Sequence, residues 1–417
     1  MKNSLINEIR LPSGWELKNL KDMTCSFKSG FSITSENISE DTTLFPVYGG
    51  NGLRGYTSTF THDSAYTLIG RQGALCGNLN YVEGKSFISE HAIAVKANNE
   101  NETKFLYYNF SRLNLNKLSE ASAQPGLSVE KLLKLETLVP PLAEQQKIAQ
   151  ALTDADDYIS ALEKLIEKKK MIKEGLMVNL LTGKQRLKEF AFNEDGTEKG
   201  YKDSELGKIP EDWDLKYFTD VFSFLSTASF SRDQLTTEEN TSACIHYGDI
   251  HTKLDYFIDT NSFISGYVSA SQVMNYVEIQ QGDLIIADAS EDLEGIGKSV
   301  EVLNQPNIKV VSGLHTFLAR DSKENFALGF RSFISSNPLI LKQYKRLASG
   351  LKVYSLSKST FKNILLPIPP KGEQESISKI LFNHIQEITI LNKKLEKAKA
   401  IKIGMMQKLL TGEIRLA

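Results

Sequence analysis

The feature that most constrains this fold is a long segment that the chain contains twice. The segment begins at Val139 as VPPLAEQQKIAQALTDADDYISALEKLIEKKKMIKEGLMVNLLTGKQRL. It recurs from Ile368, without gaps and at an offset of 229 residues, as IPPKGEQESISKILFNHIQEITILNKKLEKAKAIKIGMMQKLLTGEIRL. Identities include Pro140 with Pro369, Glu144 with Glu373, Gln145 with Gln374, Leu152 with Leu381, and the run LLTG. Chance does not produce such a match, so one structural unit is used twice.

A second, shorter pair precedes each unmatched stretch. It runs LPSGWELK from Leu11 and IPEDWDLK from Ile209, at an offset of 198 residues, and it holds both tryptophans of the chain. The offsets differ by 31 residues (229 − 198), so the second unmatched stretch is longer by about that much. We call the repeated segments frames and the unmatched stretches between them variable halves. The order along the chain is therefore frame, variable half, frame, variable half, frame. This plan indicates one scaffold that recognises two different things.

Both copies of the long segment have the pattern of a helix with an apolar stripe. Apolar residues recur every seven positions, at Leu152, Ile159 and Ile166 in the first copy and at Leu381, Ile388 and Leu395 in the second. A Pro-Pro pair precedes each helix and a glycine follows it, so each should run about 40 residues, or ~60 Å. The simplest cover for each stripe is the other copy in antiparallel pairing. The alternative is a surface helix that packs on its own domain.

The variable halves have the pattern of mixed α and β structure. Short apolar runs alternate with glycine turns, as in LFPVYGGNGLRGYTSTF of the first half and GDLIIADASE of the second. Helices are expected over TKFLYYNFSRLNL and NPLILKQYKRLAS. The predicted fold class is α+β: two globular mixed α/β domains separated by two long antiparallel helices in a coiled-coil-like spacer. The predicted segments are domain 1 at 1–138, helix 1 at 139–187, a linker at 188–208, domain 2 at 209–366 and helix 2 at 367–417.

Length and composition indicate a folded chain of more than one domain. Its 417 residues exceed what one hydrophobic core usually organises, and 41% hydrophobic with 24% charged residues is ordinary for a globular protein. No apolar run suits a signal peptide or a membrane span, so the cytoplasm is the expected compartment. Cys25, Cys76 and Cys244 lack a metal or disulfide spacing and are expected to be buried thiols.

Polar and basic residues in the loops of the variable halves are the candidates for contacts with nucleic acid. Arg and Lys suit phosphates and guanine, and Asn and Gln suit adenine, so these side chains on glycine-flanked turns can contact base edges. The candidates are Asn51, Arg54, Tyr56, Arg71, Gln72, Gln124, Lys298, Lys345, Arg346 and Lys352. The competing interpretations are a solvated Arg in a turn and a plain connection between a helix and a strand.

The charge of the chain argues mildly against DNA binding. Its formal net charge is −2, whereas contacts with phosphates need Lys and Arg. The charge is uneven: Lys and Arg number 9 against 5 Asp and Glu over 367–417, but 16 against 21 over 200–366. A DNA-binding chain with this charge would depend on partners for part of its grip on the backbone.

The motifs of the common enzyme classes that such a chain could belong to are missing. There is no G-x-x-x-x-G-K-[ST] phosphate loop, and Asn337-Pro338-Leu339-Ile340 lacks the second proline and the aromatic of an adenine-methylating loop. The six histidines show no metal-ligand spacing, so no metal site is expected. Acidic residues near Lys298 could be arranged as a metal nuclease, but a solvated loop is the simpler interpretation; they are Asp283, Asp288, Glu291, Asp292 and Glu294.

The repeated frames resemble a known family, the specificity subunits of type I restriction-modification enzymes. The resemblance covers the whole chain and rests on PPLAEQQKIAQAL with LLTGKQRL, on PPKGEQESISKIL with LLTGEIRL, and on the central GYKDSELGKIPEDWDL. It implies a non-catalytic chain with two target-recognition domains, each contacting one part of a bipartite, asymmetric site on double-stranded DNA.

The resemblance also implies partners. Two methyltransferase subunits would dock on the chain, joined by two restriction subunits in the full complex. S-adenosylmethionine, ATP and Mg²⁺ would bind those partners, and no membrane is involved. Spacer and docking residues would lie on the long helices, at Gln145, Leu152, Ile159, Ile166, Gln374, Leu381, Ile388 and Leu395. The alternatives are an assembly scaffold that does not recognise DNA and a nuclease domain.

Overall fold

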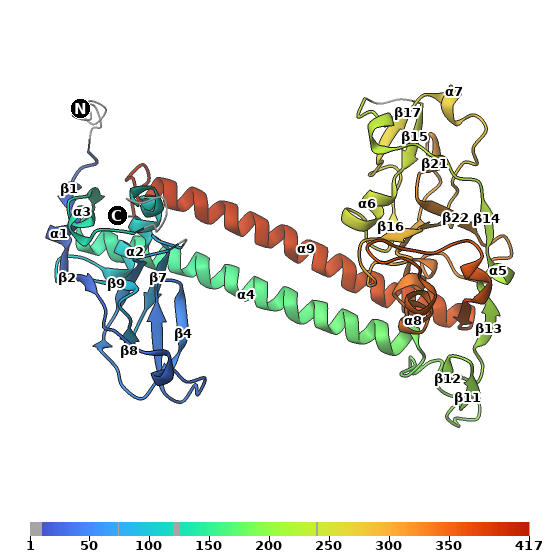
Figure 1. Cartoon of the computed structure of the whole chain (residues 1–417), viewed down its shortest axis with the longest axis horizontal. Helices are drawn as coiled ribbons and strands as arrows, with labels where there is room; N and C mark the ends of the chain where they lie inside the picture. Colours follow the sequence, from blue (N-terminus) through green and yellow to red (C-terminus); the bar gives the residue numbers. More distant parts are fainter. Residues whose placement is uncertain (1–10, 74, 120–125, 239–240, 417) are drawn as a thin grey trace. The chain divides into compact units, whose positions relative to one another are not determined.

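The computed structural model describes residues 11–73, 75–119, 126–238 and 241–416. Its internal contacts divide the chain into two compact units, Met1–Leu165 with Leu391–Ala417, and Ile166–Ile390. Each unit holds one variable half together with parts of both long helices (Figure 1). In the described ranges, no helix is both long and apolar enough to cross a membrane.

The described part of domain 1 contains two four-stranded sheets. The first is antiparallel in the order β2-β9-β6-β7, with β2 at Thr24–Ser29, β9 at Ala92–Ala97, β6 at Tyr66–Gly70 and β7 at Leu79–Val82. The second has the order β4-β3-β8-β5, with β4 at Gly52–Thr57, β3 at Phe45–Gly49, β8 at Lys85–Ile88 and β5 at His62–Asp63. Strands β3 and β8 are parallel. The helices are α1 (Leu20–Met23), α2 (Thr103–Arg112) and α3 (Val129–Leu133), with 3-10 turns at Ser35–Asn37 and Leu115–Leu118.

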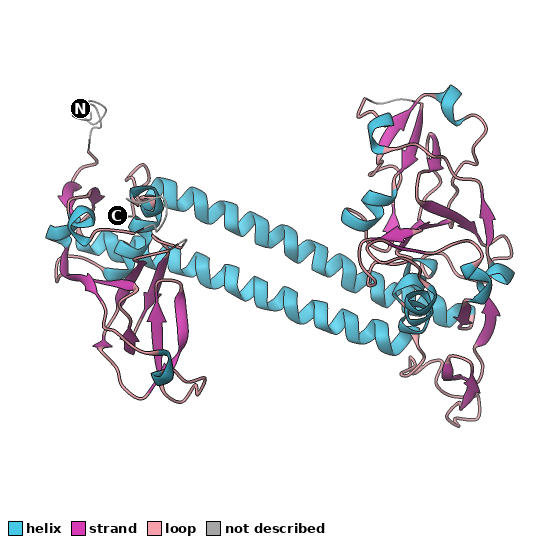
Figure 2. Ribbon diagram, in the orientation of Figure 1, coloured by secondary structure: helices cyan, strands magenta, loops and turns pink. Residues whose placement is uncertain are grey.

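Domain 2 has a related set of strands and helices (Figure 2). Its larger sheet has the order β14-β22-β18-β20-β16, with β14 at Ser223–Leu225, β22 at Thr316–Arg320, β18 at Leu284–Ala287, β20 at Ser299–Val302 and β16 at Phe257–Ile258. Strands β17 (Gly266–Val268), β15 (Ser242–Ile245) and β21 (Lys309–Ser312) form another sheet, and β19 (Ala289–Ser290) pairs with β23 (Tyr354–Ser355). The helices are α5 (Phe218–Val221), α6 (Tyr247–Thr252), α7 (Ala270–Val273) and α8 (Pro338–Leu347). Short 3-10 turns lie at Arg232–Gln234, Arg331–Ser336 and Thr360–Asn363.

The two variable halves share one topology although their sequences do not align. The order β2-β9-β6-β7 of domain 1 recurs in domain 2 as β14-β22-β18-β20, and β4-β3-β8 recurs as β17-β15-β21. The directions also agree, because β3 pairs parallel with β8 and β15 pairs parallel with β21. The duplication therefore extends from the frames into the variable halves.

The shorter frames close each variable half with a two-stranded sheet. Strand β1 (Glu16–Asn19) pairs antiparallel with β10 (Glu136–Val139), and β13 (Asp214–Tyr217) pairs in the same way with β24 (Leu365–Ile368). These strands lie at the 198 and 229 residue offsets of the two sequence repeats. The expected linker over 188–208 is more ordered than its name suggests, since β11 (Tyr201–Ser204) and β12 (Gly207–Pro210) form a hairpin.

The expectation of three buried thiols is wrong for Cys25. Cys76 and Cys244 are buried, but Cys25 is exposed. Its strand β2 shifts register against β9 between Thr24 and Ser26. A bulge of this kind leaves one residue without a ladder partner and redirects its side chain.

The two long helices have the predicted lengths and ends. Helix α4 spans Leu142–Leu181 and helix α9 spans Lys371–Leu409, which gives 40 and 39 residues. Gly183 and Gly412 follow them with φ of 70° and 74°, a conformation that favours glycine at a helix end. A Cβ on Gly183 would also lie 2.5 Å from Pro210, and one on Gly412 would lie 2.5 Å from Pro12.

The helices pack antiparallel, as predicted, and their ends are part of the domain cores. In the first unit, Asp156 pairs with Lys402 and Glu163 with Lys399, so α9 numbers fall as α4 numbers rise. The core of domain 1 includes Ile148 and Leu152 from α4, Leu409 from the end of α9, and Leu410, which directly follows α9. The core of domain 2 includes Met177, Leu180 and Leu181 from α4 with Ile377 and Leu381 from α9.

One contact joins the start of one long helix to the end of the other in each unit. Trp15 Nε1 donates to Glu144 Oε2 at 3.1 Å, and Arg415 donates to both oxygens of Glu144 at 2.7 Å. Glu144 lies in the first turn of α4, and Arg415 lies just beyond the end of α9. The carboxylate is buried, which increases the strength of these charge-assisted hydrogen bonds.

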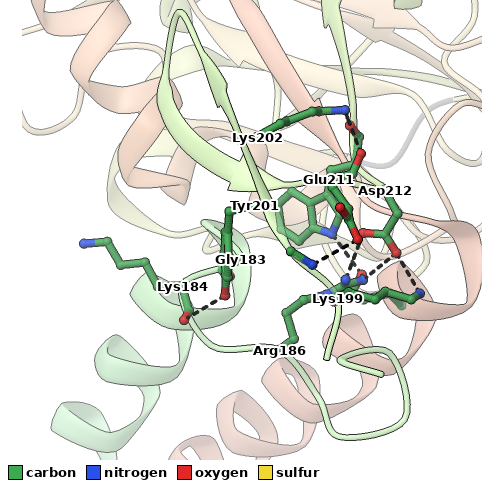
Figure 3. Close-up of polar contacts among 11 residues, drawn as sticks. Gly183, Lys184, Arg186, Lys199, Tyr201, Lys202, Glu211 and Asp212 are labelled. Atoms are coloured by element: carbon green, nitrogen blue, oxygen red, sulfur yellow. Dashed lines mark hydrogen bonds and ion pairs between the residues drawn. The ribbon is translucent and has the colours of Figure 1, made fainter. Parts of the chain in front are cut away.

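The second unit repeats this contact with its own residues. Trp213 Nε1 donates to Glu373 Oε2 at 2.9 Å, and Arg186 Nε donates to Glu373 Oε1 at 2.9 Å. Arg186 also pairs with Asp212, which Lys199 contacts at 2.8 Å (Figure 3). Burial opposes the charge of Asp212, but the hydrogen bonds from Lys199 and Arg186 outweigh it and lower the pKa of that carboxyl. The repeated segments thus supply the tryptophan, glutamate and arginine side chains of both contacts between helix ends.

Candidate nucleic-acid interface

Three turns of domain 1 bring several of the predicted contact residues together. Asn51 lies between β3 and β4, Arg54 lies in β4, and Gln72 follows β6. These side chains are exposed and line one open hollow of about 560 Å³ together with Leu75 and His91. The hollow thus offers amide, guanidinium and imidazole groups on one surface, which are groups that can pair with base edges.

Backbone hydrogen bonds hold these turns in place. The amide of Arg71 donates to the carbonyl of His91 at 2.9 Å, and the carbonyl of Arg71 accepts from Leu127 at 3.0 Å. A Cβ on Gly70 would lie 2.6 Å from the carbonyl oxygen of Gly50, so only glycine permits this approach. A Cβ on Gly50 would likewise lie 2.7 Å from the carbonyl oxygen of His91, so Gly50 and Gly70 are needed for the turns to meet.

The other candidates of domain 1 are placed differently. The Arg71 side chain is half-buried and forms no hydrogen bond or ion pair with the residues that the structure describes. Tyr56 is half-buried and lines another hollow, beside Ser39 and Leu44. Gln124 lies outside the described residues.

Domain 2 repeats the backbone contacts around the equivalent turns. The amide of Asp288 donates to the carbonyl of His315 at 3.1 Å, and the carbonyl of Asp288 accepts from Leu356 at 2.8 Å. Asp288 follows β18, the counterpart of β6, so it takes the place of Arg71. His315, between β21 and β22, takes the place of His91, which lies between β8 and β9.

Two of the basic candidates of domain 2 are engaged in ion pairs. Lys298 pairs with Asp255 at 3.1 Å and donates to the carbonyl of His251, and Lys345 pairs with Glu294. Arg346 and Lys352 are exposed and have no such partner among the described residues. Of the four basic candidates of domain 2, Arg346 and Lys352 are thus the two that no ion pair engages within the described residues.

Lys352 lies at the tip of an apolar hairpin that composition did not single out. Ser349 and Ser355 exchange backbone hydrogen bonds at its base. Leu351 is 96% exposed and Val353 is 54% exposed on either side of Lys352. Apolar side chains this exposed suit contact with a partner, and a thymine methyl group or an unstacked base step are both compatible.

The acidic residues of domain 2 do not form a nuclease site. Asp283 is buried and bound by Arg320 at 2.7 Å, while Glu294 pairs with Lys345. Among the described residues, no group of three or more His, Cys, Asp and Glu side chains is placed to hold a metal ion. The nuclease alternative therefore lacks a site in the described part of the chain.

Comparison with known proteins decides the family. A family model described as a type I restriction modification DNA specificity domain matches residues 12–174 and 210–400. The chain belongs to this family. As a specificity component of type I restriction-modification systems it is not one of their catalytic components.

Relatives of this specificity subunit match it to different extents. The EcoprrI specificity subunit of Escherichia coli is 37% identical over 138 residues, which are 32% of this chain and 34% of that protein. The putative MjaX specificity subunit of Methanocaldococcus jannaschii is 23% identical over 446 residues and covers 100% of this chain and 96% of its own length. The crystal structure of the type I system S subunit from M. genitalium shares the fold, with a TM-score of 0.63, 15% identity, and coverage of 96% and 98%.

The predicted helix residues of this specificity subunit are mostly interior. Gln145 and Gln374 are 1% exposed, and each amide donates to the carbonyl of a frame proline, Pro140 or Pro369. Leu152 and Leu381 are fully buried in the domain cores, Ile166 and Leu395 are buried, and Ile159 and Ile388 are half-buried. The buried side chains among them belong to the interior rather than to a surface, whereas Ile159 and Ile388 are partly exposed.

The sequence-based predictions missed several exposed residues, both on the two domains and on the long helices. His91 and Leu75 line the hollow of domain 1, and Leu351 projects from domain 2. On the helices, Tyr158 is 54% exposed and Leu165 is 38% exposed, seven residues apart on α4. A signal for the histidines was present, because each directly precedes an apolar strand, in HAIAVKA and HTFLAR.

Proposed function

We propose that this specificity subunit recognises a bipartite, asymmetric DNA sequence, with one half-site contacted by each domain. The repeated topology carries this proposal, because two domains of one design differ at equivalent turn positions such as Arg71 and Asp288. Arg suits guanine, whereas a carboxylate suits the amino group of cytosine. Two domains with the same topology but different side chains at equivalent turns would recognise two different half-sites.

In the same proposal the long helices act both as a spacer between the two domains and as a docking surface for partner subunits. Their length of about 40 residues, or ~60 Å, suits a spacer that sets the number of unspecified base pairs between half-sites. Methyltransferase subunits would dock on exposed apolar positions such as Tyr158 and Leu165 of α4 and Ile401 and Ile403 of α9. Two such subunits, and two restriction subunits in the full complex, complete the proposed assembly.

Partner subunits would also supply phosphate contacts that this chain, with its modest charge, lacks. With a net charge of −2, the chain alone has few cations to spare for phosphates, so methyltransferase subunits that close around the duplex would supply the remaining contacts. S-adenosylmethionine, ATP and Mg²⁺ are proposed to bind those partners rather than this chain. DNA as the ligand makes the cytoplasm the proposed compartment.

The test is to map adenine methylation across a genome in cells that carry this chain with its methyltransferase partner, and in cells that lack only this chain. A gapped, bipartite motif that disappears with the chain is the expected result, and it would also give both half-sites. If the complex assembles but no methylated motif depends on the chain, an assembly scaffold without DNA recognition replaces this proposal.

A further inference from the structure

We propose that His91 and His315 are equivalent specificity-determining residues, each contacting a base in the half-site of its own domain. This inference rests on the proposed function above. Nothing in the sequence repeats aligns these two histidines, because they lie inside the variable halves. The shared topology and the shared backbone contacts make them equivalent.

The position of His91 follows from the turns of domain 1. Its carbonyl accepts from the Arg71 amide, which holds the backbone of His91 beside the turn that carries Gln72, and both residues line the same hollow. The side chain is 51% exposed, and its Nε2 lies 3.7 Å from a carboxylate oxygen of Glu90. His91 lines the same hollow as Arg54, and its side chain is half exposed, so a half-site that occupies this hollow would meet both residues.

His315 has the corresponding position in domain 2. Its carbonyl accepts from the Asp288 amide, and its side chain is 50% exposed. Nδ1 lies 3.2 Å from the Asp288 carboxylate, and the ring meets the edge of Tyr247 with centroids 5.3 Å apart. The carboxylate and the aromatic ring orient the imidazole, so that Nε2 remains available to a ligand.

The backbone at His315 adds a separate observation. Its φ is 55°, a left-handed conformation that residues other than glycine adopt uncommonly, although histidine adopts it more often than most. Residues in such sparsely populated conformations cluster at functional sites. A glycine would fit the turn more easily, yet a large polar side chain is present.

The remaining histidines do not share this arrangement. His62 and His246 are buried, and His251 and His384 are half-buried. His251 binds the carbonyl of Ala289 through Nε2 at 2.8 Å. Of the six histidines, the two exposed ones are therefore the two that occupy equivalent turns.

An imidazole can recognise a base edge because it carries one donor and one acceptor nitrogen when neutral. In the major groove it can donate to N7 or O6 of guanine, or accept from the amino groups of adenine and cytosine. His91 would act next to Arg54 and Gln72, and His315 next to Asp288. The bases read by the two histidines would thus differ with their neighbours.

The experiment measures binding of the complex between this chain and its methyltransferase subunit to duplexes that each carry one changed base pair. His91→Ala and His315→Gly are compared with wild type, and glycine is chosen for His315 because it accepts the left-handed backbone. We expect His91→Ala to lower discrimination about 5- to 30-fold at one base pair of one half-site, and His315→Gly to do the same only in the other.

The controls separate this inference from its alternatives. Asp63→Ala changes an exposed side chain of domain 1 outside the hollow and should leave both half-sites unaltered. His91→Gln keeps a polar group and tests the position should His91→Ala fold poorly. Unchanged discrimination in both histidine variants, or an equal loss on all duplexes, overturns this inference while the bipartite motif of the wild type stands. Absence of a motif in the wild type overturns the proposed function itself.

Discussion

Arg415 donates hydrogen bonds to both carboxylate oxygens of Glu144, at 2.7 Å each, although 271 residues separate them. Arg186 binds Glu373 in the same way across 187 residues. In each unit the start of one long helix is thereby joined to the end of the other. The buried glutamate also accepts from the frame tryptophan, so each contact secures two helix ends and the first strand of a domain.

Removing Arg186 should destabilise the chain strongly. Its side chain is 4% exposed and Glu373 is 1% exposed, so Arg186→Ala leaves a buried carboxylate unpaired, at a cost of about 3–5 kcal/mol. Urea unfolding of the whole chain measures this loss as a lower midpoint for domain 2. The control Lys408→Ala removes an exposed pair with Glu413 and should change stability by less than about 0.5 kcal/mol. Equal midpoints for Arg186→Ala and wild type would contradict the prediction.

The Glu144 contact predicts a loss of stability in acid. Hydrogen bonds from Arg415, assisted by Trp15, lower the pKa of Glu144 below its usual 4.5 despite burial. The stabilisation is therefore fully present above the unfolded pKa and is lost as the pH falls through the lower folded pKa. Unfolding of wild type and Arg415→Gln is compared from about pH 6 to pH 3. Their difference should be constant near pH 6 and shrink in acid, and a difference that persists unchanged at pH 3 would argue against this ion pair.

Arg71 and Lys352 should each affect one half-site. Arg71 has no side-chain partner among the described residues of domain 1, and Lys352 is exposed at the hairpin tip of domain 2. Arg71→Ala should therefore relax recognition of one half-site, and Lys352→Ala that of the other, each by about 1–3 kcal/mol at the contacted base pair. Methylation mapping with each variant gives the two motifs. A uniform loss over all sequences, with a smaller salt dependence, would instead identify a phosphate contact.

Substitutions at exposed positions of α4 should affect docking of the partner, whereas substitutions at buried positions should affect stability. Leu165 is 38% exposed, so Leu165→Glu should weaken binding of the methyltransferase subunit at least about 10-fold while leaving unfolding unchanged. Leu152 is fully buried, so Leu152→Ala should destabilise domain 1 by about 2–5 kcal/mol. Calorimetric titration and urea unfolding measure the two effects. Wild-type affinity in Leu165→Glu would exclude this face of α4 as the docking surface.

The sequence by itself determined the features that depend on local pattern. The heptad stripe and the flanking Pro-Pro and Gly signals predicted both long helices to within a few residues, because helix formation and capping involve residues three to seven positions apart. The repeats also predicted two domains of mixed structure and the antiparallel pairing of the helices.

Only the tertiary structure decided which side chains remain available for contact. Lys298 and Lys345 were candidates by charge, and the structure adds that each forms an ion pair, with Asp255 and Glu294. Gln145 was predicted to be a spacer or docking residue, but it is buried and bonded to its own domain. The equivalence of His91 and His315 arises from strand order, which no alignment of the halves contains. These relations depend on residues brought together across tens to hundreds of positions, and a local pattern carries no information on such partners.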